Sequence, residues 1–248
     1  MKISIITVVY NNDKTIKDAI ESVLNQSYQQ IEYIVIDGAS KDNTVSIIKE
    51  FQSQIAKFVC EPDNGIYDAM NKGVGLATGD VIGILNSDDL YQDANVIETV
   101  MNQFSQDPSL DIVYGDLVYV KNEDVNSIVR NWKSIPYYDR FFERGNVPPH
   151  PSLFVKQYVY KKAGLFNLDF ILAADYEFML RIFKKHDFNS KYIERVIVKM
   201  RLGGATNQSF SNIIRQNLEV LKAWNHNQLK VPFLLMLSRI FKRLFQYF

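Results

Sequence analysis

Residues Gly79–Asp89 read Gly-Asp-Val-Ile-Gly-Ile-Leu-Asn-Ser-Asp-Asp and join an apolar run to two adjacent carboxylates. The run Val81–Leu85 is typical of a strand that is buried on both faces. In an open α/β sheet, ligands bind where the strands deliver their carboxyl ends. Two acids at such a point are unfavourable unless a cation meets them, and a divalent metal that carries a diphosphate is the natural candidate. The stretch therefore predicts an α/β fold with a metal-assisted nucleotide site.

Strands and helices alternate along the first 90 residues. We expect strands at residues 3–10, 31–36, 57–60 and 81–85, and helices at residues 14–25, 43–51 and 67–77. This alternation predicts parallel strands that are joined by crossover helices. Residues 1–90 therefore form the nucleotide-binding half of the predicted fold.

Beyond Asp89 the alternation loosens. We expect a loop at residues 136–151, strands at 111–120, 127–132 and 191–200, and helices at 94–104, 157–163, 174–185 and over most of 211–248. The predicted organisation is one domain over residues 1–205, whose second half is residues 91–205. A helical extension follows at residues 206–248.

The bulk composition fits a packed globular protein. Hydrophobic residues make up 47% of the chain, and the 28 basic side chains are matched by 28 acidic ones, so no net charge favours nucleic acid. The single cysteine, Cys60, has apolar neighbours and is expected to be a buried thiol. No apolar run reaches the ~18 residues of a membrane span, and the start of the chain lacks a signal-peptide layout. We therefore expect a cytoplasmic protein whose membrane contacts are peripheral.

Polar clusters follow the predicted strands at four places. They are Thr7, Tyr10 and Asn11; Asp37; Asp68, Asn71 and Lys72; and Asn86, Ser87 and Asp88. A tyrosine ring can lie against a base, a lone carboxylate accepts from ring N–H or ribose hydroxyl groups, and magnesium or manganese prefers oxygen ligands. Each cluster also has a structural interpretation, as residues of a turn or of a helix cap.

Four motifs in this order resemble those of family 2 glycosyltransferases of the GT-A fold. They are Ile-Thr-Val-Val-Tyr-Asn at residues 6–11, Ile-Asp-Gly-Ala-Ser-Lys-Asp-Asn-Thr at 36–44, Asp-Asn-Gly-Ile-Tyr-Asp-Ala-Met-Asn-Lys-Gly at 63–73 and Leu-Asn-Ser-Asp-Asp at 85–89. The resemblance is strong over residues 3–90 and extends more weakly to residue 205. It implies the α/β fold of nucleotide-diphospho-sugar transferases, in which helices flank a mixed, mostly parallel central sheet, here with a C-terminal helical tail.

The resemblance implies that a uridine-diphosphate sugar binds across the first half. Thr7, Tyr10 and Asn11 would line the base and ribose, and Asp37 would accept a hydrogen bond from the uracil ring. Asp88 would bind a divalent metal, either manganese or magnesium.

This chain departs from the family pattern at two positions. Asn86 stands where the family more often has the first Asp of an Asp-x-Asp motif, although an amide can still accept from a ribose hydroxyl or a metal-bound water. Met70 stands where many relatives carry arginine, so we expect the diphosphate contacts to shift to Lys72.

The resemblance places the catalytic base at Asp175, at the start of a predicted helix. In an inverting displacement the acceptor hydroxyl attacks the anomeric carbon opposite the leaving diphosphate, so one base suffices. The structural alternative is a helix N-terminal acid that the helix dipole favours, and Glu177 is the rival base. His150 and Arg201 lie on predicted loops that face the site. His150 could contact phosphate or metal, and the alternative is a structural histidine. Arg201 could act as a phosphate clamp, and the alternative is a solvated arginine.

The C-terminal residues 230–248 form a basic and apolar segment with helical spacing. Its apolar residues are Val231, Phe233, Leu234, Leu235, Leu237, Ile240, Phe241, Leu244 and Phe245, and its basic residues include Arg239, Lys242 and Arg243. An amphipathic helix of this kind can lie in a membrane interface. The alternatives are a helix that packs on the domain and a homodimer contact.

These features predict an inverting, metal-dependent glycosyltransferase. It would transfer a single sugar from a UDP-sugar to a hydroxyl of a growing, lipid-linked glycan of the bacterial surface, at the inner face of the plasma membrane. A Gln-x-x-Arg-Trp signature of processive synthases is missing, which favours single addition. Two alternatives remain open: a nucleotidyltransferase, whose usual glycine- and lysine-rich phosphate loop is not found after the first strand, and a non-catalytic nucleotide-sugar-binding protein.

Overall fold

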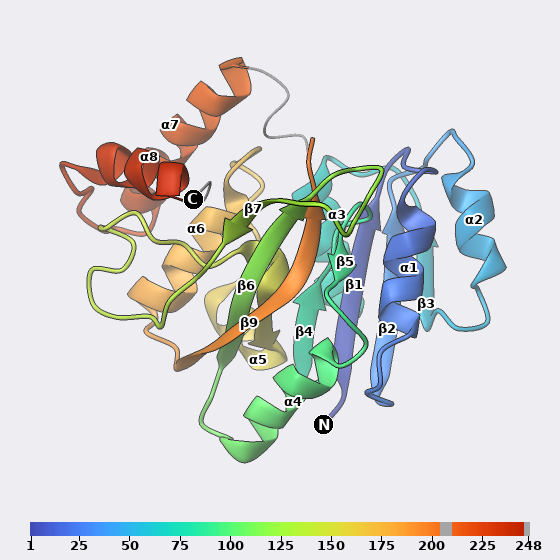
Figure 1. The fold of residues 1–248 in the computed structure, drawn as a ribbon. Coiled ribbons are helices and arrows are strands. Elements are labelled where there is room, and N and C mark those ends of the chain that lie inside the picture. Colours follow the sequence, from blue (N-terminus) through green and yellow to red (C-terminus); the bar gives the residue numbers. More distant parts are fainter. Residues whose placement is uncertain (204–209, 246–248) are drawn as a thin grey trace.

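A computed structural model describes residues 1–203 and 210–245 of the chain. Nine described strands form one sheet in the order β3-β2-β1-β4-β8-β6-β9-β5, with β7 paired to β6 (Figure 1). Three of these strands, β5, β7 and β8, run against the other six. The expected mixed, mostly parallel α/β sheet is therefore confirmed.

The first half is the parallel part of the sheet. Its strands are β1 (Ile3–Val9), β2 (Ile31–Asp37), β3 (Lys57–Cys60) and β4 (Val81–Ile84). Strand β1 pairs in parallel with both β2 and β4, and β2 pairs in parallel with β3. Because these strands share a direction, their carboxyl ends meet at one edge of the sheet, and the predicted parallel half is confirmed.

Helices cover both faces of the sheet (Figure 1). Helices α1 (Ile16–Leu24), α2 (Thr44–Glu50) and α4 (Val96–Gln106) pack on one face. Helices α3 (Ile66–Leu76), α5 (Gln157–Ala163) and α6 (Ala174–Leu180) pack on the other. Each face of the sheet therefore carries its own apolar core.

The second half adds strands of both directions. They are β5 (Leu90–Tyr91), β6 (Ile112–Val120), β7 (Ile128–Trp132), β8 (Leu153–Lys156) and β9 (Ser190–Arg201). Strand β8 lies antiparallel between β4 and β6, directly after a short 3₁₀ turn at His150–Ser152. The sequence did not predict β5 or β8, because each is too short to show a periodicity of its own. The expected helix at residues 174–185 ends as an α-helix at Leu180 and continues as a π-helical turn, Arg181–Lys185.

The C-terminal helices are α7 (Phe210–His226) and α8 (Leu235–Phe245). Helix α7 buries Trp224, whose Nε1 donates a hydrogen bond of 2.9 Å to the hydroxyl of Tyr176 on α6. Helix α7 therefore shares the apolar core of the second half of the chain, and the expected boundary at residues 205–206 lies outside the described residues. Within the described part of the chain, the helices are too short or too polar to cross a membrane.

Candidate active site

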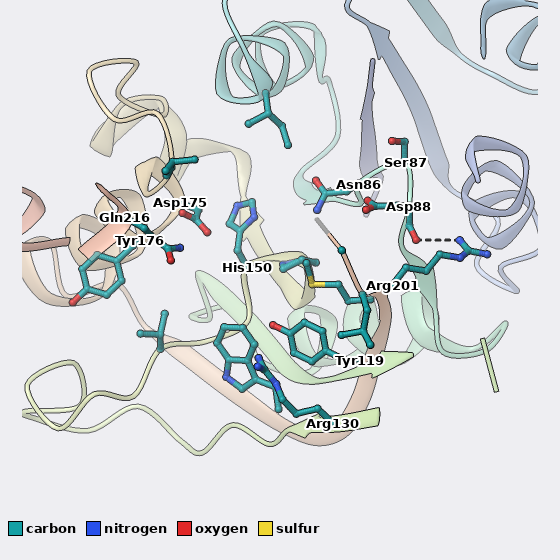
Figure 2. Close-up of a pocket in the computed structure, with 18 of the residues that line it drawn as sticks. Asn86, Ser87, Asp88, Tyr119, Arg130, His150, Asp175, Tyr176, Arg201 and Gln216 are labelled. Atoms are coloured by element: carbon teal, nitrogen blue, oxygen red, sulfur yellow. Dashed lines mark hydrogen bonds between the residues drawn. The ribbon is translucent and has the colours of Figure 1, made fainter. Parts of the chain in front are cut away.

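A cleft of about 2060 Å³ opens along the carboxyl edge of the sheet. Its walls come from the ends of β1, β4 and β9, from the start of α3, from the β6–β7 region, and from α6 and α7. In Figure 2, Asn86 and Asp88 lie on one side of this cleft and Asp175 on the other, with His150 between them. The cleft therefore brings together residues from both halves of the chain.

The turn after β1 presents Tyr10 to the cleft. The Tyr10 side chain is 58% exposed and lines the cleft. Asn11 has a positive φ of 47°, and its Oδ1 accepts a hydrogen bond of 2.8 Å from the backbone N–H of Lys41. Thr7 is placed differently from the prediction, since its side chain is fully buried and its Oγ1 accepts a 3.0 Å hydrogen bond from Tyr33. Thr7 lies within the strand, where its side chain faces the core and not the cleft.

Asp37 ends β2 but does not line the cleft. Its side chain is fully buried, and its oxygens accept hydrogen bonds from the backbone and the hydroxyl of Ser40, at 2.9 Å and 2.5 Å. The thiol of Cys60 donates a further hydrogen bond of 3.1 Å to Asp37, and this hydrogen bond raises the pKa of Cys60. Cys60 is exposed, so the expected buried thiol is wrong. Asp37 is therefore occupied by its own turn.

Asp63 is the acid that lines this part of the cleft. A Cβ on Gly38 would lie 2.4 Å from Oδ2 of Asp63 and 3.3 Å from the Tyr10 ring, so the Asp63 carboxylate and the Tyr10 ring both lie close to Gly38. Oδ1 of Asp63 accepts a hydrogen bond of 2.9 Å from the backbone of Gly65. The sequence contains Asp63 in its third motif, but nothing in a turn-type Asp-Asn-Gly pattern separates a ligand-facing acid from a turn acid.

The polar face of α3 is used for contacts within the protein. Asp68 accepts a 2.9 Å hydrogen bond from the backbone of Asn64, and Lys72 donates one of 2.8 Å to the carbonyl of Pro62. The amide of Asn71 exchanges two 2.9 Å hydrogen bonds with the backbone of Phe166. Asp68, Asn71 and Lys72 therefore do not line the cleft, and their expected role in donor binding stays a prediction.

Other residues at the start of α3 line the cleft instead. They are Ile66, Tyr67, Ala69 and Met70, together with Gly65, which directly precedes the helix. Helical spacing predicts which residues share a face, but it does not say whether the polar or the apolar face meets a ligand.

The motif after β4 lies in the cleft as predicted. Asn86, Ser87 and Asp88 all line it. The Ser87 hydroxyl accepts a 2.9 Å hydrogen bond from the amide of Asn12, a residue that the sequence did not single out. This contact joins the ends of β1 and β4, which are neighbours in the sheet.

The two adjacent acids are poorly compensated. Burial raises the pKa of Asp88, although the charge of Arg201 acts in the opposite direction. Burial and the charge of Asp88 raise the pKa of Asp89 well above its usual range. Asn86 donates a 3.1 Å hydrogen bond to Asp89, but the remaining side-chain oxygen of each is buried without a hydrogen-bond partner. A cation at this point would relieve the repulsion.

The residues present fit a sparsely ligated divalent ion. The described residues contain no cluster of three acidic, histidine or cysteine side chains that would form a cage. Magnesium and manganese ions in nucleotide sites are often held by one or two carboxylates together with substrate phosphates. Asp88, with the free oxygen of Asn86 beside it, fits this kind of site.

Arg201 holds the acidic loop in place. Its guanidinium donates a 3.0 Å hydrogen bond to the carbonyl of Asp88 (Figure 2). It donates another, of 3.3 Å, to the carbonyl of Asn122, and it pairs with the carboxylate of Asp18. Its side chain is only 5% exposed. Arg201 lines the cleft, but its guanidinium is engaged within the protein, so the expected role as a free phosphate clamp is not supported.

Asp175 faces the cleft from the first turn of α6. Its Oδ1 accepts a 2.9 Å hydrogen bond from the hydroxyl of Tyr67 on α3. Glu219 of α7 accepts hydrogen bonds of 2.8 Å and 3.0 Å from the backbone of Leu172 and Ala173, just before this helix. Both neighbouring helices therefore fix the position of Asp175.

Glu177 is not available as a base. Its side chain is fully buried, its carboxylate lies 2.9 Å from the guanidinium of Arg181, and Asn227 donates a 3.0 Å hydrogen bond to it. The rival prediction for the base is therefore wrong, because Glu177 points into the core between α6 and α7.

His150 lies in the cleft wall near Asp175. Its ring packs edge-to-face against Phe166, with centroids 5.5 Å apart. Burial lowers the pKa of His150, and the charge of Asp175 acts in the opposite direction. His150 is therefore a mainly neutral imidazole at neutral pH.

Known proteins are similar to this chain in fold and, in part, in sequence. The profile of Glycosyl transferase family 2 matches residues 4–160. An uncharacterized glycosyltransferase of Mycobacterium tuberculosis is 33% identical over 181 residues, which cover 72% of this chain and 68% of the relative. TarS of S. aureus in complex with UDP-GlcNAc superposes with a TM-score of 0.70 at 14% identity, covering 98% of this chain and 72% of that one. The mannosyltransferase PcManGT of Pyrobaculum calidifontis, in complex with GDP-Man and Mn²⁺, gives a TM-score of 0.68 at 16% identity, covering 98% and 70%.

The two solved structures confirm the GT-A-like fold, and at these identities they show no more than the fold. The family profile spans more than half of the chain, and the mycobacterial relative is above 30% identity over two thirds of both sequences. The chain therefore belongs to Glycosyl transferase family 2.

Proposed function

We propose that this glycosyltransferase moves one sugar from a UDP-sugar to a hydroxyl of a glycan acceptor, with inversion at the anomeric carbon. The observation that carries the proposal is the placement of Asp88 and Asp175 in one cleft, on walls that come from different halves of the chain. A donor held at Asp88 would then present its sugar toward the carboxylate of Asp175. Residues 1–90 supply the donor side in this proposal, and residues 91–205 supply the acceptor side.

The nucleotide base binds beside Tyr10 in this proposal. Tyr10 offers an exposed ring for stacking, and Asp63 offers a carboxylate oxygen beside Gly38, to which the Tyr10 ring is also close. A carboxylate accepts hydrogen bonds only, which suits the ring N–H of uracil. Asp63 takes the place that we expected for Asp37, whose oxygens are already bonded to Ser40 and Cys60. TarS, which has the same fold, binds UDP-GlcNAc.

Asp88 holds a magnesium or manganese ion in this proposal, with Asn86 and Asp89 beside it. When bound, the ion offsets the negative charge that develops on the departing diphosphate. The poorly compensated acids Asp88 and Asp89 support this assignment, and so does the Mn²⁺ in the structurally similar PcManGT. Arg201 keeps the loop of Asp88 in position through its hydrogen bond to the loop backbone.

Asp175 accepts the proton of the acceptor hydroxyl in this proposal. The hydroxyl oxygen bonds to the anomeric carbon, the bond to the diphosphate oxygen breaks, and the proton passes to a carboxylate oxygen of Asp175. Tyr67 occupies Oδ1, which leaves Oδ2 for the acceptor. His150, as a neutral ring beside this point, can donate a hydrogen bond without repelling the metal.

The test is a transfer assay with the full chain, a panel of UDP-sugars, Mn²⁺ or Mg²⁺ and glycan acceptors. The expected result is metal-dependent release of UDP with a product whose anomeric configuration, measured by NMR, is opposite to that of the donor. A product that retains the donor configuration would contradict the single displacement at Asp175. Diphosphate released from UTP, in place of UDP from UDP-sugars, would contradict the transferase assignment itself.

A further inference from the structure

An exposed apolar segment leads into α8. Phe233 is 100% exposed, and Leu234 and Leu237 are 56% and 54% exposed. Neighbouring large apolar side chains on a surface mark an interaction site more often than chance exposure. The chemistry of the cleft gives these three side chains no role.

The segment has a fixed support. Leu235 is 1% exposed and belongs to the main core, and the hydroxyl of Ser238 donates a 3.2 Å hydrogen bond to the carbonyl of Glu143. Gly145 lies so close to α8 that an added Cβ would be 2.6 Å from the carbonyl carbon of Ser238. The start of α8, which carries the exposed apolar side chains, is therefore fixed to the rest of the protein.

A second, smaller groove of about 720 Å³ lies beside this segment, between it and the loop at residues 140–144. Arg140, Arg144 and Lys242 line the groove together with Glu143. The carboxylate of Glu143 lies 2.6 Å from the ammonium group of Lys184, which balances its charge. Cationic side chains therefore dominate the groove and lie next to the exposed apolar side chains.

We propose that this basic apolar patch, formed by Arg140, Arg144, Phe233, Leu237 and Lys242, docks the enzyme on an anionic phospholipid surface. Aromatic and leucine side chains partition into the boundary between headgroups and acyl chains, while lysine and arginine bind the lipid phosphates. The patch offers both on one support. This assignment is narrower than the amphipathic helix that the sequence predicts: Leu235 faces the core, and the side chains of Ile240, Phe241, Arg243, Leu244 and Phe245 lie outside the description.

Charge complementarity favours a lipid surface over a second copy of the chain. In a symmetric dimer the same patch meets itself. Arg140, Arg144 and Lys242 would then face the same three cations of the other copy, and like charges at an interface are unfavourable. An anionic membrane instead provides the opposite charge.

The patch adjoins the acceptor side of the main cleft. Lys242 lines both the basic groove and the cleft, and Arg239 lines the cleft while its guanidinium lies 4.9 Å from the ring centroid of Tyr176. Docking would therefore bring a lipid-linked acceptor to the cleft. This last step rests on the proposed function, whereas docking itself does not.

The test is co-sedimentation of the full chain with vesicles of phosphatidylcholine, alone or mixed with phosphatidylglycerol. The expected result is binding to the mixed vesicles only, weakened by salt. The double variant Phe233→Ser/Leu237→Ser and the double variant Arg140→Gln/Arg144→Gln are each expected to weaken binding about tenfold or more. Ile128→Ser is the matched apolar control, because Ile128 is 55% exposed on β7, away from the patch.

Two outcomes would overturn the docking proposal. One is that the wild-type chain stays in the supernatant with anionic vesicles, or that both double variants bind these vesicles as well as the wild type does. The other is a patch variant that lowers the molar mass in analytical ultracentrifugation, which would assign the patch to a dimer. Transfer to a water-soluble glycan acceptor separates the two proposals: it is expected to be unchanged in the patch variants, and its absence in the wild type would count against the proposed function alone.

Discussion

The hydroxyl of Tyr67 donates a 2.9 Å hydrogen bond to Oδ1 of Asp175, although 108 residues separate the two along the chain. Tyr67 is on α3, beside the proposed donor site, and Asp175 is on α6, at the proposed acceptor side of the cleft. Burial and the charge of Asp175 raise the pKa of Tyr67 well above its usual range, so the phenol keeps its proton and remains a donor. Tyr67 is therefore a positioning residue for the proposed base.

Replacing Tyr67 with phenylalanine tests this positioning role. The ring packing against Phe166 is retained, but Asp175 loses the hydrogen bond that fixes its orientation. We expect kcat to fall about tenfold with little change in KM, because a misplaced base affects the transition state more than the bound donor. Tyr160→Phe, in the core beside Phe178, is the matched control and is expected to leave kcat unchanged. A KM effect without a kcat effect in Tyr67→Phe would assign Tyr67 to substrate binding instead.

The two acids of α6 are expected to respond differently to amide substitution. Asp175→Asn removes the proposed base, so transfer should fall by roughly 10²–10⁴-fold while UDP binding is kept. Glu177→Gln instead breaks a buried pair with Arg181, so the free energy of unfolding should fall by about 3 kcal/mol or more. Single-turnover assays and urea denaturation distinguish these results. Full turnover in Asp175→Asn would reject this residue as the base.

Asp63 and Asp37 offer a similar comparison at the proposed binding site of the uracil ring. Asp63→Asn replaces one of the proposed acceptor oxygens by an amide nitrogen, so UDP affinity should fall about tenfold. Asp37→Asn disrupts the turn that Ser40 closes, so it should lower stability by about 1–3 kcal/mol with a smaller effect on UDP affinity. Calorimetric titration with UDP and thermal unfolding of both variants check the assignment. If Asp37→Asn weakens UDP binding more than Asp63→Asn does, the original expectation for Asp37 is correct.

Glu32 lies near the start of β2, at the edge of the sheet opposite to the cleft. Its carboxyl group makes the stability of the fold depend on pH. Burial alone would raise the pKa of Glu32, but hydrogen bonds from Ser4 and Thr78, and the ammonium group of Lys57, outweigh it and lower the pKa to about 2. A carboxyl with a lowered folded-state pKa stabilises the fold above its ordinary value of 4.5, and this contribution is lost as the pH falls toward 2.

Glu32→Gln is therefore expected to lose about 2 kcal/mol of unfolding free energy at pH 7. The difference from the wild type should shrink steadily between pH 4.5 and pH 2. Urea denaturation across this range measures it. Glu194→Gln is the control, since its partner Lys133 is a surface residue and the loss should be much smaller. A difference that does not change with pH would mean that the charge of Glu32 is not the cause.

The parallel half of the fold could be predicted because each apolar strand ends in polar residues and is followed by a helical pattern. The antiparallel insertion of β8 could not, because a four-residue strand depends on its neighbours β4 and β6 and has no pattern of its own. The motifs at Asn86–Asp88 and Asp175 reach the cleft as expected. In contrast, Asn71 bonds to Phe166 and Arg201 bonds to Asp88, and such contacts between distant segments are set by tertiary packing.

Local chemistry also limits what the sequence predicts about single acids. Asp37 and Asp63 both stand in turns with glycine nearby, and the local pattern alone does not separate a turn acid from a ligand-facing acid at either position. Only the structure shows that Asp63 lines the cleft while Asp37 is buried and bonded within its own turn. The same limit applies to Glu177, which is two residues from Asp175 but on the buried face of α6.

The central claim is that a divalent ion held by Asp88 joins the donor diphosphate to the protein. Isothermal titration of the wild type and of Asp88→Ala with UDP, with Mn²⁺ or with EDTA, tests this claim most directly. We predict that the wild type binds UDP at least tenfold more tightly with Mn²⁺ than with EDTA, and that Asp88→Ala shows no such difference. Equal affinity of the wild type in Mn²⁺ and EDTA, or an undiminished Mn²⁺ effect in Asp88→Ala, would contradict the account.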